Sequence, residues 1–378
     1  MQHTLVLSAN AAPQRGGQGL NLYHMASGLR EYFDVRLFCK APLPGVPTDI
    51  TPESRLSTWI GKAPLVRRFR DFQNRLADEH FDRYVSRRLP PAKLFQGVSG
   101  QCCQSLEQAK RMGCRTIVDS ITAHIQFFFE HQMRECARFN VRPAIDLAFC
   151  HRMQQEYERA DLIRVMSEQS KQTFGERGFT NVAVLHPPLN VSEFPQATFQ
   201  EGKFRVSYVG LLEPWKGFHY LVDAFSSLEL PDSELIFWGG SGSRTVTKYF
   251  QEKIGQDPRI QVRSIVVRNS YGEVYGKSSV LVHPSLSDGF GYVVGEAMAS
   301  GVPVIVTRNT GAADLVVDGK NGYIVPVCDS EAIRERLAHL AAHPALLREM
   351  GRQARETMRS RNGDEWRTYA AALQQLAS

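Results

Sequence analysis

The chain has 378 residues, of which 43% are hydrophobic and 22% are charged, and it carries a formal net charge of +6. Because a single core rarely grows beyond about 250–300 residues, this length predicts two domains, and the composition is that of a globular protein. No apolar run approaches the ~20 residues that a membrane span needs, which argues against a membrane-spanning protein. The mild positive charge comes without a nucleic-acid recognition module, so we expect no nucleic-acid partner.

The first residues and the cysteines indicate the compartment. The N-terminal sequence MQHTLVLSAN contains an apolar run typical of a first strand, without the basic lead or cleavage site of a secretion signal. The seven cysteines form neither an even-numbered framework nor a CxxC pair. We therefore expect reduced thiols, no zinc and a cytoplasmic protein.

Short β-type runs alternate with helix-like segments along the whole chain. The expected strands are Thr4–Leu7, Val35–Phe38, Lys93–Phe95, Thr116–Val118, Leu162–Val165, Val182–Leu185, Phe204–Val209, Glu234–Trp238, Ile260–Val262, Val280–His283, Val304–Thr307 and Gly322–Val325. Helical patterns lie between them, as in Leu20–Tyr32, Gly217–Leu228 and Glu331–Ala342. Alternation of this kind predicts parallel sheets that are covered by helices on both faces.

The segment His186–Lys203 interrupts the alternation with three prolines and many polar residues, and we interpret it as a linker between domains. The predicted fold is α/β, with two doubly wound, Rossmann-like domains at residues 1–190 and 191–363 that face each other across a cleft. Ligands of such sheets bind at the carboxyl ends of the strands. A last helix, within residues 364–378, is expected to pack back on the first domain.

The positive charge is densest in Lys62–Arg88, where seven arginines alternate with apolar side chains. These arginines are Arg67, Arg68, Arg70, Arg75, Arg83, Arg87 and Arg88. A solvated helix face is the simpler interpretation of this pattern. Peripheral contact with the anionic inner face of a membrane is the alternative, and it stays open at this point.

Residues 283–307, HPSLSDGFGYVVGEAMASGVPVIVT, form the most informative stretch of the chain. A strand is followed by a loop with Gly289 and Gly291 and then by a helical pattern. A glycine turn at a helix start offers free backbone N–H groups and the positive end of the helix dipole, which suit a diphosphate. Asp288 and Glu296 frame this turn, and carboxylates repel phosphate but accept hydrogen bonds from sugar hydroxyls. The stretch therefore predicts a site for a group that contains both a sugar and a diphosphate.

The same stretch resembles the signature of the retaining glycosyltransferases of family 4, which have the GT-B fold. That family's pattern is an acid, Gly-Phe-Gly, a second acid eight positions after the first, Ala-Met-Ala and Gly-x-Pro-Val. The matching residues here are Asp288–Gly291, Glu296–Ala299 and Gly301–Val304. An ordinary core turn would explain the Gly-Phe-Gly alone, but it would not explain the combined pattern.

Other positions follow the family's order. The resemblance implies that Lys216, in VGLLEPWKG, binds donor phosphate, and that Gly16 and Gly17, in the loop after the first strand, let the backbone approach the phosphates closely. It also implies that His124 touches the transferred sugar. The alternatives are a solvated surface lysine, a flexible glycine loop and a histidine of the core or of the surface.

By this resemblance the chain is an enzyme that moves a hexose from UDP- or GDP-hexose to a saccharide or lipid-linked glycan, with retention at the anomeric carbon, in polysaccharide or glycoconjugate assembly. The implied residues are Lys216, Asp288 and His124 for catalysis and Gly16, Gly17, Gly289, Phe290, Gly291 and Glu296 for donor binding. The departing phosphate oxygen can take the acceptor proton, so no enzymic nucleophile is needed. No DxD-type or HxxxH motif lies in the donor region, and we expect neither a metal nor a cofactor besides the donor itself.

Two departures from the family pattern keep other functions open. Leu211 stands where arginine is usual, and Asp288 stands where glutamate is usual. Arg244 or Arg268 are candidates to supply the missing cation, and the backbone around Ser264–Arg268 is expected to read the nucleobase. A non-catalytic nucleotide-sugar-binding protein is the main alternative, followed by an epimerase or phosphorylase of the same fold. The sequence names neither the base, the sugar nor the acceptor.

Overall fold

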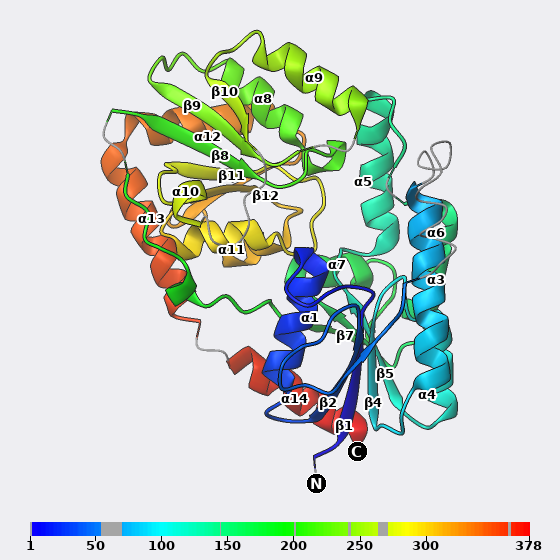
Figure 1. The fold of residues 1–378 in the computed structure, drawn as a ribbon. Coiled ribbons are helices and arrows are strands. Elements are labelled where there is room, and N and C mark those ends of the chain that lie inside the picture. Colours follow the sequence, from blue (N-terminus) through cyan, green and yellow to red (C-terminus); the bar gives the residue numbers. More distant parts are fainter. Residues whose placement is uncertain are drawn as a thin grey trace. The chain divides into compact units, whose positions relative to one another are not determined.

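The computed structural model describes residues 2–53, 70–143, 145–199, 202–240, 243–263, 271–361 and 364–378. The chain forms two compact units (Figure 1). The first unit comprises Met1–Phe129, Pro143–Pro187 and Gly363–Ser378, and the second comprises Glu130–Arg142 and Pro188–Asn362. The short segment Glu130–Arg142 thus groups with the second unit, although it lies within the 1–190 range expected for the first domain.

The first unit contains a seven-stranded parallel sheet with the order β3-β2-β1-β4-β5-β6-β7. Its strands are β1 (Thr4–Ser8), β2 (Asp34–Cys39), β3 (Thr48–Ile50), β4 (Leu94–Val98), β5 (Arg115–Ser120), β6 (Leu162–Val165) and β7 (Val182–Val184). Its helices are α1 (Gly16–Leu29), α3 (Arg70–Arg88), α4 (Cys103–Arg111), the start of α5 (Ile125–Arg138), α6 (Leu147–Arg159), α7 (Glu168–Gly175) and α14 (Asp364–Ala377).

Successive side chains of β1 enter different cores, as the two-residue period of a strand requires. Leu5 and Leu7 pack in one cluster with residues of α1 and α14, whereas Val6 packs in another with residues of α3, α4 and α6. The C-terminal helix is an integral part of this unit, because a Cβ added at Gly28 of α1 would lie 2.6 Å from the ring of Trp366. The first sheet is therefore covered on both faces.

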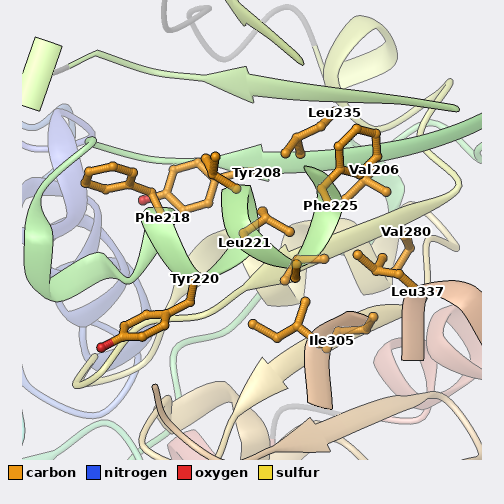
Figure 2. Packing of buried hydrophobic residues seen from close by; sticks show 14 of the residues in the cluster. Val206, Tyr208, Phe218, Tyr220, Leu221, Phe225, Leu235, Val280, Ile305 and Leu337 are labelled. Atoms are coloured by element: carbon orange, nitrogen blue, oxygen red, sulfur yellow. The ribbon is translucent and has the colours of Figure 1, made fainter. Parts of the chain in front are cut away.

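The second unit contains a six-stranded parallel sheet with the order β10-β9-β8-β11-β12-β13. Its strands are β8 (Phe204–Val209), β9 (Ser233–Trp238), β10 (Ile260–Arg263), β11 (Val280–His283), β12 (Val304–Thr307) and β13 (Gly322–Val325). Its main helices are α8 (Phe218–Ser226), α9 (Arg244–Ile254), α10 (Tyr271–Val274), α11 (Tyr292–Ala299), α12 (Ser330–Ala342) and α13 (Pro344–Arg359). Figure 2 shows the core of this unit, where Leu221 and Phe225 of α8 pack with Val206, Leu235 and other strand residues.

The predicted fold class of two doubly wound α/β domains is confirmed by these two parallel sheets. One described strand, β3, was not predicted, because three residues that follow a proline carry too little apolar pattern to indicate a strand. In both sheets the strand order reverses at one point, between β1 and β4 and between β8 and β11. At such a point the loops after neighbouring strands diverge, which opens the carboxyl edge of the sheet to ligands.

The basic stretch Lys62–Arg88 lies partly outside the described residues, which begin again at the start of α3. Within α3, Arg75 pairs with Asp146 at 3.2 Å, and the Arg88 guanidinium lies 4.1 Å from the centroid of the Tyr84 ring. None of the helices in the described ranges is long and apolar enough to cross a bilayer. Contact of this stretch with a membrane surface stays a prediction.

A buried polar network joins β5, β6 and α1 in the first unit. Arg164 is opposite Asp119 in the sheet register and donates to its carboxylate at 2.8 Å, and the same nitrogen donates to Asn21 at 2.7 Å. Asn21 donates in turn to the second oxygen of Asp119 at 2.7 Å, and Arg164 also donates to the carbonyl of Leu185. Arg164 is 1% exposed, so the charge is stabilised only because all these partners surround it.

We expect Arg164→Leu to lower the free energy of unfolding by about 3–5 kcal/mol, because it leaves the Asp119 carboxylate buried without its cation. Urea unfolding followed by circular dichroism measures this loss. The matched control is Arg36→Leu in the same sheet, since Arg36 and Asp34 form a pair that is about half exposed. The control should change stability by less than about 1 kcal/mol, and equal effects of the two variants would contradict the prediction.

Candidate functional site

The loops after β8 and β11 meet at the point where the strand order of the second sheet reverses. The loop after β8 ends in the turn Pro214–Lys216, and Gly217 then begins α8 with a φ of 68°. A Cβ at Gly217 would lie 2.0 Å from the carbonyl oxygen of Pro284. Only glycine allows both this backbone conformation and this close approach. The glycine therefore brings Lys216 next to the loop that carries Asp288.

Lys216, Asp288 and His283 form the charged centre of the site. The Lys216 ammonium donates to Oδ2 of Asp288 at 2.6 Å, and Nε2 of His283 lies 3.0 Å from the same oxygen. The side chains of Asp288 and His283 are only 17% and 4% exposed. Burial alone would raise the pKa of Asp288, but the charge of Lys216 and the His283 bond hold that pKa well below its usual range. Asp288 is thus an anion at any physiological pH.

The family resemblance implied separate roles for Lys216 and Asp288, whereas in the structure their side chains bond each other directly. An ammonium has three N–H donors, so one bond to Asp288 leaves capacity for a phosphate oxygen. The same bond neutralises much of the lysine's charge before any ligand arrives. His283 was not among the predicted site residues. The signal that points to it is its position as the last residue of β11, at the carboxyl edge where Lys216 and Asp288 also lie.

The loop of Gly289, Phe290 and Gly291 is fixed by the segment that follows β12. The backbone N–H of Asp288 donates to the carbonyl of Asn309 at 3.1 Å, and Ala312 donates to the carbonyl of Phe290 at 2.6 Å. Gly291 precedes α11 with a φ of 84°. Phe290 is 1% exposed, so its ring belongs to the core and only its backbone remains for ligand binding.

Glu296 projects from α11 and is held by Tyr275. The tyrosine hydroxyl donates to Oε2 of Glu296 at 2.7 Å, and Tyr275 itself is buried. This bond fixes one oxygen of a half-buried carboxylate.

The residues Ser264–Arg268, expected to read the nucleobase, lie outside the described residues, as does the side chain of Arg244. The side chain of Leu211 is described, and it is 54% exposed.

Part of helix α5 supports the loop that bears Lys216. Glu135 of α5 lies 2.9 Å from Nε2 of His219 and accepts a hydrogen bond from the Tyr220 hydroxyl at 3.0 Å. His219 and Tyr220 are the second and third residues of α8, two and three positions after Gly217. One turn earlier on α5, His131 lies 3.5 Å from the amide of Asn309. Sequence reasoning missed this support, because nothing local to α5 indicates which unit its later half packs on.

Gly16 and Gly17 begin α1 in the first unit, just after the loop that follows β1. Gly16 has a φ of 63°, and a Cβ at either position would meet no heavy atom within 4 Å. The backbone there is therefore open to a ligand. Gly19 differs, because its Cβ would lie 2.1 Å from the carbonyl oxygen of Ala12. The glycine run thus combines one residue needed for packing with two that leave open space.

His124 also belongs to the first unit, where it lies in an aromatic cluster. Its ring centroid is 4.9 Å from that of Phe174 and 5.5 Å from that of Tyr157, and its side chain is fully buried. Burial lowers the pKa of His124 to about 4, helped by the charge of Arg177. These contacts favour the alternative of a core histidine. The contact with a transferred sugar stays a prediction without support from this packing.

The described residues contain no group of three or more His, Cys, Asp or Glu side chains arranged to hold a metal ion. All seven cysteines are free thiols. The expectation of a donor site without a metal stays a prediction.

Comparison with solved structures identifies the fold. Sucrose-phosphate synthase from Thermosynechococcus elongatus has a similar structure, with a TM-score of 0.76 at 20% identity over 99% of this chain and 98% of that one. Anabaena HepE in complex with UDP-glucose gives a TM-score of 0.70 at 16% identity over 99% of both chains. The fold is GT-B.

Residues 191–357 match the family described as Glycosyl transferases group 1, and these residues include Lys216, Asp288 and Glu296. D-inositol 3-phosphate glycosyltransferase from Corynebacterium glutamicum (strain R) is 31% identical over 179 residues. That match covers 45% of this chain and 42% of the relative, so the chain spans less than half the length of that relative. Residues 191–357 are thus similar to the glycosyl transferase group 1 family, which confirms the resemblance found in the sequence.

We expect His124 to make the protein less stable in acid. Its pKa is about 4 in the folded chain against 6.5 for a free histidine, so only the unfolded chain takes up the proton between these values. The neutral His124 side chain therefore makes its full contribution to the free energy of unfolding above pH 6.5. This contribution falls by up to about 3 kcal/mol as the pH falls toward 4. Urea unfolding of the wild type and His124→Phe at pH 7 and pH 4.5 measures it.

The His124→Phe variant should lose less stability than the wild type between these two pH values. Asp78 and Glu156, whose pKa values burial raises to about 6 and about 7, contribute in the opposite direction, but they are present in both proteins. His151→Phe, at an exposed position on α6, is the control. Parallel pH profiles for wild type and His124→Phe would show that His124 is solvated, as a ligand-binding histidine would be.

Proposed function

We propose that the chain is a retaining glycosyltransferase that moves a hexose from a nucleoside diphosphate hexose to a saccharide or lipid-linked glycan. The observation that carries this proposal is the Lys216–Asp288–His283 cluster at the carboxyl edge of the second sheet, beside the glycine turn that begins α11. The family match covers all of these residues. A cation, an ionised carboxylate and the start of a helix in one place suit a ligand with both phosphate and sugar groups.

The leaving diphosphate would be stabilised by Lys216 and by the first N–H groups of α11. The ammonium supplies a positive charge that Asp288 offsets in part, and the helix start supplies N–H donors and the positive end of its dipole. Both are fixed in place before the ligand binds, because Gly217 and Gly291 set the geometry of their loops. Preorganised charge of this kind is usually the largest contribution to such a reaction. The departing phosphate oxygen would accept the proton of the acceptor hydroxyl.

Asp288 and Glu296 would bind hydroxyl groups of the donor. Both hydrogen bonds to Asp288 go to Oδ2, and an ionised carboxylate has further lone pairs with which to accept from a sugar hydroxyl. Lys216 and His283 hold the carboxylate in one orientation while it does so. Glu296, oriented by Tyr275, would accept from the ribose. Asp288 therefore orients the sugar, and it is not a nucleophile in this mechanism.

The donor and acceptor classes rest on the family and on one neighbour. The HepE structure contains UDP-glucose, which supports a UDP-hexose as the first donor to test, with a GDP-hexose second. In this proposal the second unit binds the donor, the first unit binds the acceptor, and the reaction requires neither a metal nor a further cofactor. It would take place in the cytoplasm, with peripheral membrane contact through residues 62–88 when the acceptor is lipid-linked.

A nucleotide-sugar-binding protein without turnover is the second candidate, and two observations favour it. Leu211 supplies no charge where the resembled family has arginine, and Asp288 neutralises part of the charge of Lys216. A site with weaker positive charge binds a donor but stabilises the leaving diphosphate less well. The two candidates differ in whether a sugar is transferred.

We expect one of UDP-glucose, UDP-galactose, GDP-mannose and ADP-glucose to bind the purified protein equally well with and without EDTA. Calorimetry measures the binding, and NMR of the product reports the anomeric configuration, which should be the same as in the donor. Binding without transfer to any saccharide tested supports the non-catalytic candidate. Absence of binding by all four donors would contradict both candidates.

We expect Lys216→Ala to lower kcat by roughly 100- to 1,000-fold, because the variant loses a preorganised charge beside the leaving group. Steady-state kinetics with the donor identified above measures the loss. The control is Lys248→Ala, at an exposed lysine on α9 whose side chain is 78% exposed, and it should leave kcat unchanged. Similar kinetics for the two variants would remove Lys216 from the reaction.

A further inference from the structure

A second polar site lies in the first unit, where the strand order of its sheet reverses between β1 and β4. Asn10 follows the carboxyl end of β1, and Gln101 follows the carboxyl end of β4. Both line a cavity of about 310 Å³, which is within the ~300–1,000 Å³ range of small-molecule sites. The edge of this sheet is thus hollowed at the place where open parallel sheets bind their ligands.

Hydrogen bonds fix the side chains that line this cavity. Oε1 of Gln101 accepts from the backbone of Asn10 at 2.8 Å and from the Gln18 amide at 2.9 Å. The Asn10 amide donates to Asp78 at 2.7 Å. Asn74 and Asp78 reach the cavity from α3, and Gln18 reaches it from the first turn of α1, next to Gly16 and Gly17. The side-chain amides of this lining are therefore already held in place beside the carboxylate of Asp78.

The chemistry of this lining distinguishes between classes of ligand. Amides donate and accept hydrogen bonds, as sugar hydroxyls do, and the ring of Phe149 offers an apolar face for the C–H side of a sugar ring. The charges of the lining are those of Arg75, Asp78 and Asp146, and Arg75 is paired with Asp146 at 3.2 Å. Lys40 and Arg152 act on Asp78 from outside the lining. The cavity itself therefore carries no net positive charge to attract a phosphate.

We propose that the cavity around Asn10, Gln18, Asp78 and Gln101 binds an uncharged sugar ring of the acceptor. The inference rests on the proposed transferase function and specifies its acceptor as a neutral saccharide end. A phosphorylated polyol, the kind of compound in the name of the C. glutamicum relative, would bring a negative charge next to Asp78. The phosphate and the Asp78 carboxylate would repel each other, so such a ligand binds less well in this cavity.

Saturation-transfer NMR on the full chain tests the proposal with four probes, the methyl glycosides of glucose, galactose, mannose and N-acetylglucosamine, and with glucose 6-phosphate and inositol 3-phosphate. At least one methyl glycoside should bind, and both phosphates should bind more weakly. Ala77→Phe fills the cavity and should abolish glycoside binding, and Asp78→Asn, which keeps the shape, should weaken it about tenfold. The control Ala148→Phe, at an exposed position on α6, should change nothing.

Donor binding, measured on the same variants, separates this inference from the proposed function. Donor binding that persists in Ala77→Phe together with lost glycoside binding supports the cavity as the saccharide site. Preference for the phosphates, glycoside binding unaffected by Ala77→Phe and Asp78→Asn, or no binding of any glycoside would overturn the inference while donor binding stands. Absence of donor binding in the wild type would instead overturn the proposed function.

Discussion

The contact between Gly217 and Pro284 is the constraint on which the second unit's site depends. The loops after β8 and β11 approach each other so closely here that a Cβ at position 217 would lie 2.0 Å from the carbonyl oxygen of Pro284. The ion pair of Lys216 and Asp288 follows from this contact, because the lysine precedes Gly217 by one residue. The pair then fixes the protonation state of Asp288 and the orientation of His283. A backbone contact thereby determines the electrostatics of the site.

Contacts between segments that are distant in the sequence also organise the first unit, but there they are hydrogen bonds between polar side chains. Its strand order also reverses at one point, between β1 and β4, and two sets of its polar side chains bond one another. Arg164, Asp119 and Asn21 bond one another inside the unit, and Asn10, Asp78 and Gln101 do so at the edge of the cavity. The first set is almost completely buried and supports the fold. The second set borders open space, so its amides and carboxylate can also meet a ligand.

Much of the fold could be predicted from the sequence, because strand–helix alternation and the glycine-rich motif are local patterns. The strand β3 was missed because it has only three residues, and the packing of the later half of α5 was missed because it depends on Glu135 meeting His219 far along the chain. The residues of the candidate donor site could be named from the motif and the family resemblance. Their mutual bonds could not, since sequence says that Lys216 and Asp288 are 72 positions apart and nothing about the distance between their charges. His124 shows the opposite case, in which a pattern suggested a ligand contact and packing favours a core residue.

The two departures from the family pattern have a joint electrostatic consequence. The resembled family has an arginine and a lysine for the donor diphosphate, whereas here Leu211 replaces the arginine and Lys216 pairs with Asp288. The shorter aspartate still reaches the lysine, at 2.6 Å, with His283 as its second partner. In the proposed donor complex, a diphosphate oxygen would accept from an N–H of the ammonium that Asp288 does not use, and it would share the lysine's charge with that carboxylate. The His283 contact with Oδ2 would then still hold the carboxylate in an orientation from which it can accept from a sugar hydroxyl.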